Sequence, residues 1–388
     1  MTAATPLGGI LVADFSRVLA GPLATMTLAD LGARVIKVER PRAGDDTRAW
    51  GPPFSAHAAT YFESVNRNKE SIALDLKDPA DLVRARRLTE RADVVVENFL
   101  PGTMDRLGLG YEQVSAANPG VVYASVSGFG SGAGADLPGY DFIVQAVGGL
   151  MHITGEADGL PTKAGVALVD VLTGKDAVIG ILAALHRRQV TGAGARLEVS
   201  LLSSLLGALA NQAAAHLGAG ASPSRLGNVH PSIAPYELLN CSDGPLAIAC
   251  GNDGQFARLV EALGVPELAA DPRFTTNPDR VAHRPALRSA LEAALRTRPA
   301  AHWQDRLTRV GVPAGQVNDI AGGIALAEAA GLDPTIEVHD AAGESHGRQI
   351  RPPVTWEPVF VPRRQAPPRL DEHGDALRDW LDTELGAD

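Results

Sequence analysis

Cysteine is scarce in this chain, which has two thiols, Cys241 and Cys250, among 388 residues. Two cysteines can form at most one bridge, and a large chain without a disulfide framework is typical of proteins kept in a reducing compartment. The stretch from Met1 to Phe15 also lacks a basic region followed by a long apolar run, which argues against a secretion signal. We therefore predict two free, buried thiols and a cytoplasmic location.

Long apolar runs and lysine are also lacking. No stretch reaches the roughly 18 apolar residues that cross a bilayer, so we expect no membrane span. The net charge of −10 argues against broad binding to nucleic acid or to anionic membranes, although it permits a local basic pocket. Three of only five lysines lie in the first fifth of the chain, where we predict a phosphate site from Lys37, Lys69 and Lys77 with Arg34, Arg40, Arg42, Arg48 and Arg67.

Several familiar catalytic signatures are absent or incomplete. No Walker loop occurs, and the ten histidines show no metal-binding spacing, so we predict no metal site. The first predicted strand-to-helix turn, residues 16–22, lacks the G-x-G-x-x-G pattern, which argues against an NAD enzyme. Gly343–Gly347 matches G-x-S-x-G, but Arg351-Pro352-Pro353 prevents the helix that a nucleophile elbow requires.

The apolar pattern predicts an α/β fold with an open, mostly parallel sheet. A length of 388 residues and a hydrophobic content of 45% predict a globular protein with two domains or one elaborated domain. Short apolar runs alternate with helical patterns, as in repeated βαβ units. The strands are predicted at Ile10–Phe15, Val35–Val38, Ile72–Leu76, Val94–Val96 and Val121–Val126, and the helices at about 21–32, 79–92, 173–188 and 201–217.

A connector rich in Gly, Ala, Ser and Pro, Gly218–Ser224, marks the predicted domain boundary. Beyond it, Tyr236–Asn240 and Leu246–Cys250 flank Asp243-Gly244, a dipeptide that favours a tight hairpin. The stretch that follows is mainly helical in pattern. From about Thr335 the chain is Pro-rich, and we predict irregular structure until a short helix at about 376–385.

One carboxylate stands out at the end of an apolar run. Asp170 closes Gly165–Asp170, just before the helix predicted from Thr173. A buried aspartate needs a partner or a purpose, and two interpretations fit the spacing. Asp170 is either the N-cap of that helix or a carboxylate nucleophile near a helix start, where backbone N–H groups stabilise negative charge. Spacing alone does not decide between them.

Several segments, taken together and in order, resemble the family III CoA-transferases of the CaiB–BaiF type, from about Leu7 to the C-terminus. The resembling segments are Asp14–Pro22, Leu31–Glu39, Asn66–Lys69, Leu74–Lys77, Val96–Gly102, Ser127–Gly130, Gly139–Asp141, Val169–Val171 and Thr173-Gly174. The resemblance implies that Asp170 attacks an acyl-CoA to give an aspartyl anhydride, which the CoA thiolate converts into an enzyme thioester. An acceptor carboxylate then reverses the sequence, without a metal.

The resemblance also implies where CoA binds. The family's contacts carry over onto Leu19, Ala20, Arg40, Leu74, Asp75, Leu76, Lys77, Asn98, Phe99, Arg106 and Tyr140. Among these, the three cations Arg40, Lys77 and Arg106 suit phosphate oxygens or the adenine ring. Tyr140 fits equally well as a core aromatic whose hydroxyl is satisfied.

Two segments, Pro161–Ala167 and Arg225–His230, look most like members that use succinyl-CoA and a short dicarboxylate such as itaconate, malate or hydroxymethylglutarate. The second carboxylate of such an acid needs a partner, for which Arg48, His57 and His230 are candidates and Arg17 a weaker one. His230 precedes a proline and is equally a structural turn residue. Gly251 and Gly254 lie where formyl-CoA members carry a mobile run of glycines, and the departure from that run counts against formyl and oxalyl substrates.

The fold implied by the resemblance is α/β, with a large domain that carries a Rossmann-like sheet and a smaller α+β domain. The large domain comprises residues 1–220 and a returning segment, 331–388; the small domain comprises 225–330, and two chains interlock as a homodimer. Within this fold, an α-methylacyl-CoA racemase would need a histidine where Tyr140 stands, and tyrosine is a poor base at neutral pH. A non-catalytic CoA-binding protein is the other alternative, and the intact Asp170 argues against it.

Overall fold

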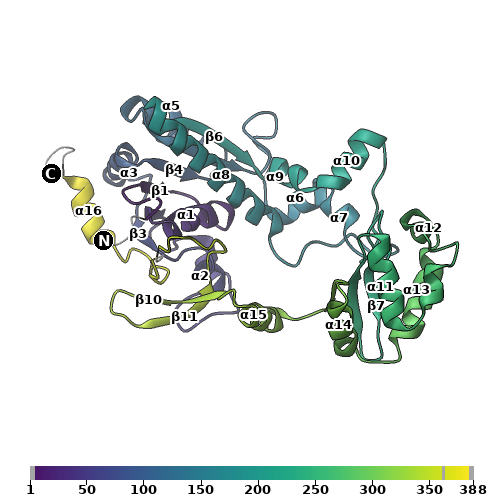
Figure 1. Cartoon of the computed structure of the whole chain (residues 1–388). Helices are drawn as coiled ribbons and strands as arrows, with labels where there is room; N and C mark the ends of the chain where they lie inside the picture. The colour runs from purple at the N-terminus through teal and green to yellow at the C-terminus, as the bar shows by residue number, and fades with distance from the viewer. Residues whose placement is uncertain (1–4, 361–362, 384–388) are drawn as a thin grey trace. The chain divides into compact units, whose positions relative to one another are not determined.

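A six-stranded parallel sheet is the centre of the larger of two compact units (Figure 1). The computed structural model describes residues 5–360 and 363–383. Valine-rich strands buried on both faces suit a parallel sheet, and the order β3-β2-β1-β4-β5-β6 reverses direction between β1 and β4. The strands are β1 (Leu11–Asp14), β2 (Arg34–Glu39), β3 (Lys69–Ala73), β4 (Val94–Glu97), β5 (Val122–Ser127) and β6 (Ala195–Ser200). The predicted parallel sheet is therefore confirmed, with β3 beginning three residues earlier than expected.

Helices cover both faces of this sheet. One apolar cluster joins the sheet to α1 (Ala20–Asp30), α6 (Asp141–Val147), α8 (Leu168–Thr191) and α9 (Leu201–Ala208). A second cluster joins the opposite face to α3 (Pro79–Arg91), α4 (Thr103–Arg106), α5 (Tyr111–Ala117) and α16 (Gly374–Asp382). The large unit is thus a three-layer α/β structure. Three short elements complete its N-terminal half and its middle: the 3-10 turn η1 (Asp46–Ala49), α2 (Thr60–Glu63) and α10 (Ala210–Ala219). The short helix α7 (Leu150–Ile153) begins at the last residue of this part of the large unit and continues into the smaller unit.

Three elements differ from the sequence predictions. The helix predicted from Thr173 begins at Leu168, so Asp170 lies inside its first turn. The helix predicted over 201–217 is interrupted at Leu209 and forms α9 and α10. The segment from Thr335, predicted as irregular, contains the antiparallel hairpin β10 (Thr335–His339) and β11 (Ser345–Ile350). Alternate residues of β10, Ile336 and Val338, are buried, which supplies the period of two that holds a strand against a core.

The C-terminal segment returns to the large unit and covers its sheet edge at β3. The larger unit comprises the described residues of 1–150, 163–221 and 333–388. The backbone N–H of His373 donates to the carbonyl of Ser71 (3.1 Å), and the N–H of Ala73 donates to Asp371 Oδ1 (2.8 Å). These contacts occupy backbone groups that an edge strand otherwise leaves free.

The smaller unit comprises Met151–Thr162 and Ser222–Leu332. The predicted hairpin is confirmed as β7 (Tyr236–Asn240) and β8 (Pro245–Ala249), and β9 (Ala314–Gln316) adds a third antiparallel strand. Cys241 and Cys250 are free and buried in its core, as expected. Its helices are α11 (Asp253–Leu263), η2 (Pro266–Ala269), α12 (Asn277–Ala282), α13 (Arg284–Leu295), α14 (Ala300–Arg309) and α15 (Ile320–Ala329). Over residues 5–360 and 363–383, none of the helices is both long enough and apolar enough to traverse a bilayer.

Candidate active site

The point where the strand order reverses, between β1 and β4, is where open α/β sheets bind ligands, outside the carboxyl ends of the strands. The loop after β1, residues 16–19, and the loop after β4 meet there. Asn98 Oδ1 accepts from the backbone N–H of Arg17 (2.8 Å), and Asn98 Nδ2 donates to the carbonyl of Arg17 (2.7 Å). Both loops that the family resemblance assigns to CoA are therefore joined at this crevice.

A half-exposed cluster of charged and aromatic side chains lies beside these loops. The Arg17 guanidinium lies over the Phe99 ring, 5.3 Å from its centroid. Asp46 pairs with both Arg17 (3.3 Å) and Arg40 (2.5 Å). Arg17, Arg40 and Phe99, which follow β1, β2 and β4, therefore converge on one edge of the sheet.

The remaining residues predicted to contact CoA have varied surroundings. Leu74 is buried in the same apolar cluster against which Leu76 and Phe99 pack, whereas Asp75 and Lys77 are exposed. Arg106 is exposed in α4, and its Nη2 donates to Thr103 Oγ1 (2.9 Å). Lys77 and Arg106 are thus accessible cations, while Leu74 is part of the core.

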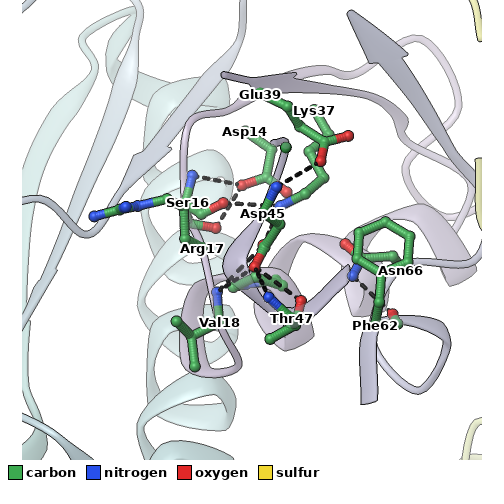
Figure 2. Close-up of polar contacts among 12 residues, drawn as sticks. Asp14, Ser16, Arg17, Val18, Lys37, Glu39, Asp45, Thr47, Phe62 and Asn66 are labelled. Atoms are coloured by element: carbon green, nitrogen blue, oxygen red, sulfur yellow. Dashed lines mark hydrogen bonds and ion pairs between the residues drawn. The ribbon is translucent and has the colours of Figure 1, made fainter. Parts of the chain in front are cut away.

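The phosphate site predicted from Lys37 and Lys69 is wrong for these two lysines. Both side chains are fully buried on parallel strands, where Lys37 pairs with Asp45 (2.9 Å) and Lys69 with Asp14 (3.0 Å). A lysine enclosed in this way has its charge neutralised internally and offers no donor to an external phosphate. Figure 2 shows Asp14, Lys37 and Asp45 beside the loop that contains Ser16 and Val18.

Asp170 is the third residue of α8, which corrects the interpretation that it is the N-cap. The cap position is Ala167, which has no capping side chain. Asp141, from the first turn of α6, supplies the cap instead: its Oδ1 accepts from the N–H groups of Val169 (2.8 Å) and Asp170 (3.3 Å). Because another residue caps the helix, the Asp170 carboxylate is left for a different role.

The Asp170 carboxylate is buried without a donor. It is 9% exposed, and no group among the described residues donates a hydrogen bond to either of its oxygens. Burial, and next the negative charge of Asp141, raise the pKa of Asp170 to about 7. A buried acid that no partner stabilises is characteristic of functional sites.

A short chain of amide contacts fixes Asp141 next to Asp170. Gln145 is fully buried, its Nε2 donates to Asp141 Oδ2 (2.6 Å), and its Oε1 accepts from the N–H of Ala164 (2.9 Å). The site residues Asp141 and Gln145 were not identified from the sequence. Asp141 lies in a segment that resembles the family. It caps a helix that begins 27 residues later in the chain, and a contact between residues so far apart has no local sequence pattern that could predict it.

The start of α8 packs against the start of α1, which links Asp170 to the loop of residues 16–19. A Cβ added at Gly174 would lie 2.7 Å from the carbonyl oxygen of Ala20, so only glycine permits this approach of the two helices. Tyr61 lies close enough to Asp170, Asp141 and Asp45 for their negative charges to affect its pKa. Burial, followed by the charges of Asp170, Asp141 and Asp45, raises the pKa of Tyr61 to about 12. Tyr61 was also missed, because an isolated tyrosine in a Pro-rich segment carries no sequence signal.

The aromatic Tyr140 is 60% exposed at the N-cap of α6, so the alternative that it is a core aromatic is wrong. The residues predicted for the acid substrate are divided between the two units. Arg48 is held by Glu39 through two contacts of 2.7 and 2.8 Å and by the Pro368 carbonyl, which accounts for most of its donors. His57 is exposed and stacks on His346 (3.7 Å), in the large unit.

His230 and Gly251 lie in the smaller unit. His230 stacks on Tyr236 (5.0 Å), and its Nδ1 accepts from the N–H of Ser232 (3.1 Å), a contact typical of a turn residue. The N–H of Gly251 donates to Gln255 Oε1 (2.7 Å) just before α11. Within residues 5–360 and 363–383, no group of three or more His, Cys, Asp or Glu side chains is arranged to hold a metal ion.

Comparison with known proteins identifies the family of the chain. The model of CoA-transferase family III matches residues 7–374. The chain belongs to this family. As a family III CoA-transferase, it acts on acyl-CoA and carboxylic acid substrates.

Relatives of this CoA-transferase align with it along most of their length. It is 44% identical over 378 residues to an acetyl-CoA:oxalate CoA-transferase of Acetobacter aceti, covering 96% of this chain and 95% of the relative. It is 43% identical over 392 residues to a succinate–glutarate CoA-transferase of Agrobacterium fabrum, covering 97% and 96%. A crystal structure of a CAIB/BAIF family protein from Brucella suis has a TM-score of 0.87 at 45% identity and covers 97% of this chain and 100% of that one.

Proposed function

We propose that this CoA-transferase uses the carboxylate of Asp170 as its nucleophile. The observation that supports this most strongly is that Asp170 is buried without a hydrogen-bond donor in the first turn of α8, next to the start of α1. Burying an unpartnered carboxylate destabilises the folded state by several kcal/mol, so such a site persists where function requires it. A carboxylate with a raised pKa is also a better nucleophile once ionised.

The proposed reaction conserves the energy of the thioester through four exchanges. An Asp170 oxygen attacks the acyl carbon of the donor, the C–S bond breaks, and CoA thiolate and an aspartyl anhydride form. The thiolate attacks the Asp170 carbonyl carbon, which gives an aspartyl-CoA thioester and releases the donor acid as a carboxylate. The acceptor carboxylate attacks this thioester to form a second anhydride, and thiolate attack on its acyl carbon regenerates Asp170. No net proton is taken up or released.

Two neighbours support this chemistry by their charge state. Tyr61, with its pKa raised to about 12, stays protonated at neutral pH, so it is a hydrogen-bond donor rather than a base near Asp170. Asp141 keeps the first-turn N–H groups of α8 occupied and adds negative charge beside Asp170. Burial and the charge of Asp141 favour a nucleophile that is ionised only near pH 7 and above.

We further propose that the donor is succinyl-CoA and the acceptor a short dicarboxylate such as itaconate, malate or hydroxymethylglutarate. The Agrobacterium relative acts, by its name, between succinate and glutarate, both short dicarboxylates. The name of the Acetobacter relative includes oxalate, so the departure at Gly251 does not by itself exclude an oxalyl substrate. With most donors of Arg48 engaged by Glu39 and Pro368, the exposed His57 is the better candidate for the distal carboxylate of the acid.

We also propose that two chains form an interlocked homodimer. The observation that supports a dimer is a set of large apolar side chains that are exposed in the single chain. Helix α10 buries none of its residues, and large apolar side chains are exposed on α6, α8, α9 and α10, namely Phe142, Val147, Ile179, Val190, Leu206 and Leu217. Exposed apolar surface of this extent is typical of a protein interface.

The test of the nucleophile is a variant that keeps the fold. We expect Asp170→Ala to bind CoA with the wild-type dissociation constant and to transfer no acyl group, because both covalent intermediates need the carboxylate. Wild-type protein incubated with acyl-CoA should carry a CoA-sized adduct on the peptide that contains Asp170, as measured by mass spectrometry, and the variant should not. Activity in Asp170→Ala near the wild-type level would contradict the mechanism. A racemase would instead exchange the α-hydrogen of a 2-methylacyl-CoA with deuterated water, and we expect no exchange.

A further inference from the structure

The loop after β1 is held by side chains at five consecutive backbone groups. Asp14 Oδ1 accepts from the N–H of Ser16 (2.9 Å), and Lys37 Nζ donates to the carbonyl of Ser16 (2.9 Å). Asn98 binds both the N–H and the carbonyl of Arg17, and both carboxylate oxygens of Asp45 accept from the N–H of Val18 at 3.3 Å. Figure 2 shows the contact of Ser16 with Asp14 and that of Val18 with Asp45. Loops usually satisfy such groups with water, so this segment is held to one conformation.

The conformation that is held is an unfavourable one. Val18 has a φ of +71°, in the left-handed region that a β-branched residue rarely adopts. Such a conformation persists only where the surroundings impose it, and it is found mainly at functional sites. The contact from the Val18 N–H to Asp45 acts on the strained residue itself.

The anchoring groups form a buried network of four charges. Asp14, Lys37, Asp45 and Lys69 are each at most 1% exposed, and Lys37 pairs with Asp45 while Lys69 pairs with Asp14. Lys37 Nζ binds both the Ser16 carbonyl and Asp45 (2.9 Å each). Buried ion pairs contribute little net stability compared with an apolar core, so their retention calls for another explanation. The loop contacts supply one.

Asp45 also connects the loop to the exposed cations. It begins the η1 turn, in which Asp46 pairs with Arg17 and Arg40. Asp45 therefore holds the backbone of the loop, and the adjacent Asp46 holds the guanidinium groups of Arg17 and Arg40. Directly after the loop, the carbonyl of Leu19 accepts from the N–H of Leu23 in the first turn of α1, so the loop also determines where that helix starts.

We infer that Asp45 is a positioning residue, which holds the loop of residues 16–19 with Val18 strained so that the loop is already in the conformation that binds acyl-CoA. This inference rests on the proposed site, in which Leu19 and Ala20 contact CoA. Pre-organisation of this kind lowers the free-energy cost of binding, because the ordering is complete before the ligand arrives. The role concerns the affinity for CoA and leaves the chemistry at Asp170 unchanged.

The decisive comparison is between Asp45→Ala and the matched variant Thr47→Val. The Thr47 hydroxyl donates to the same carboxylate (2.8 Å) and is equally buried, but it forms no hydrogen bond with the loop. We expect both variants to melt at lower temperature. Only Asp45→Ala should weaken binding of CoA and of acyl-CoA, by about tenfold in the dissociation constant measured by titration calorimetry. In the same variant KM for acyl-CoA should rise while kcat per folded active site changes by less than about threefold.

Release of the strain gives a second test. Glycine adopts the φ of Val18 without cost, so Val18→Gly combined with Asp45→Ala should recover at least about threefold of the lost affinity without recovering the melting temperature. A purely structural role for Asp45 would not produce this recovery. If Asp45→Ala does not fold, Asp45→Asn, which retains one acceptor oxygen, replaces it, and we expect a loss of affinity of at least about threefold.

The possible outcomes separate this inference from the proposed function. Wild-type protein that binds CoA, with an Asp45→Ala or Asp45→Asn variant that binds it equally well, would contradict the inference alone. If the wild type binds CoA and the Leu19→Trp variant binds it with the same affinity, the proposed location of CoA is contradicted, and the inference with it. A loss of affinity in Thr47→Val as large as in Asp45→Ala would show that the effect is general destabilisation.

Discussion

The carboxylate of Asp141 accepts a hydrogen bond of 3.3 Å from the backbone N–H of Asp170. Two acidic residues are therefore neighbours at the N-terminus of α8. The shorter contact from Val169, at 2.8 Å, holds Asp141 in this position. Burial disfavours ionisation of Asp170, and the neighbouring negative charge of Asp141 disfavours it further. The site therefore sets both where the nucleophile lies and the pH at which it is charged.

The first prediction concerns the pH dependence of activity. Because only the ionised form of Asp170 attacks the thioester, kcat/KM for acyl-CoA should rise about tenfold per pH unit below pH 7 and level off above it. The measurement is a pH–rate profile between pH 5 and 9, with CoA affinity measured over the same range to separate binding from chemistry. A rate that is already maximal at pH 5 would contradict the raised pKa of Asp170.

The second prediction concerns stability. The pKa of Asp170 is about 7 in the folded protein and near 4 in the unfolded chain, so the folded state binds more protons between these values. Stability on account of this group therefore falls as the pH rises from 4 to 7. Asp170→Asn should unfold at higher denaturant concentration than the wild type at pH 8, with a gain on the order of a few kcal/mol, and should lose this advantage at pH 4. Asp176→Asn, an exposed position on the same helix, is the control.

The third prediction separates the two functions of Asp141. Asp141→Asn retains an oxygen for the N–H groups of Val169 and Asp170 and removes the charge, so the pH–rate profile should move to lower pH. Asp141→Ala also removes the cap and should lower the free energy of unfolding by about 1 kcal/mol. Profiles that coincide with the wild type in both variants would show that Asp141 has no electrostatic effect on the nucleophile.

The fourth prediction tests the interlocked homodimer. Interlocked chains separate only by unfolding, so two differently tagged preparations, mixed under native conditions, should yield no mixed dimer over days. The same preparations, unfolded together and refolded, should yield mixed dimers and serve as the control. A monomer in dilute analytical ultracentrifugation, or rapid exchange of subunits, would contradict the proposed architecture.

The fifth prediction concerns the acceptor acid. With succinyl-CoA as the donor, short dicarboxylates should exceed monocarboxylates of equal length by at least about tenfold in kcat/KM, which corresponds to roughly 1.4 kcal/mol for one charged contact. His57→Ala should reduce this preference while leaving the rate with butyrate unchanged. Butyrate that accepts CoA as well as the dicarboxylates do would show that the pocket has no distal anion site.

The sequence predicted the sheet better than the site, for physical reasons that individual residues illustrate. Val94–Glu97 and Val122–Ser127 form strands because apolar β-branched runs suit a sheet buried on both faces, which is a local property. The start of α8 at Leu168 depends on a cap from Asp141, and the partners of Lys37 and Lys69 come from other segments of the chain. Because β2 and β3 are buried on both faces, their period of two does not reveal that a lysine points inward. Contacts distant in sequence therefore determine the candidate site.

The closure of the β3 edge by residues around Asp371 and His373 has a consequence for synthesis on the ribosome. Translation proceeds from the N-terminus, so β3 emerges about 300 residues before the segment that covers it. During that interval a nascent chain presents an open edge of a hydrophobic parallel sheet, the kind of surface that pairs with other chains. Chaperone binding to this edge, or slow translation after it, therefore bears on the yield of folded enzyme even though neither affects the finished molecule.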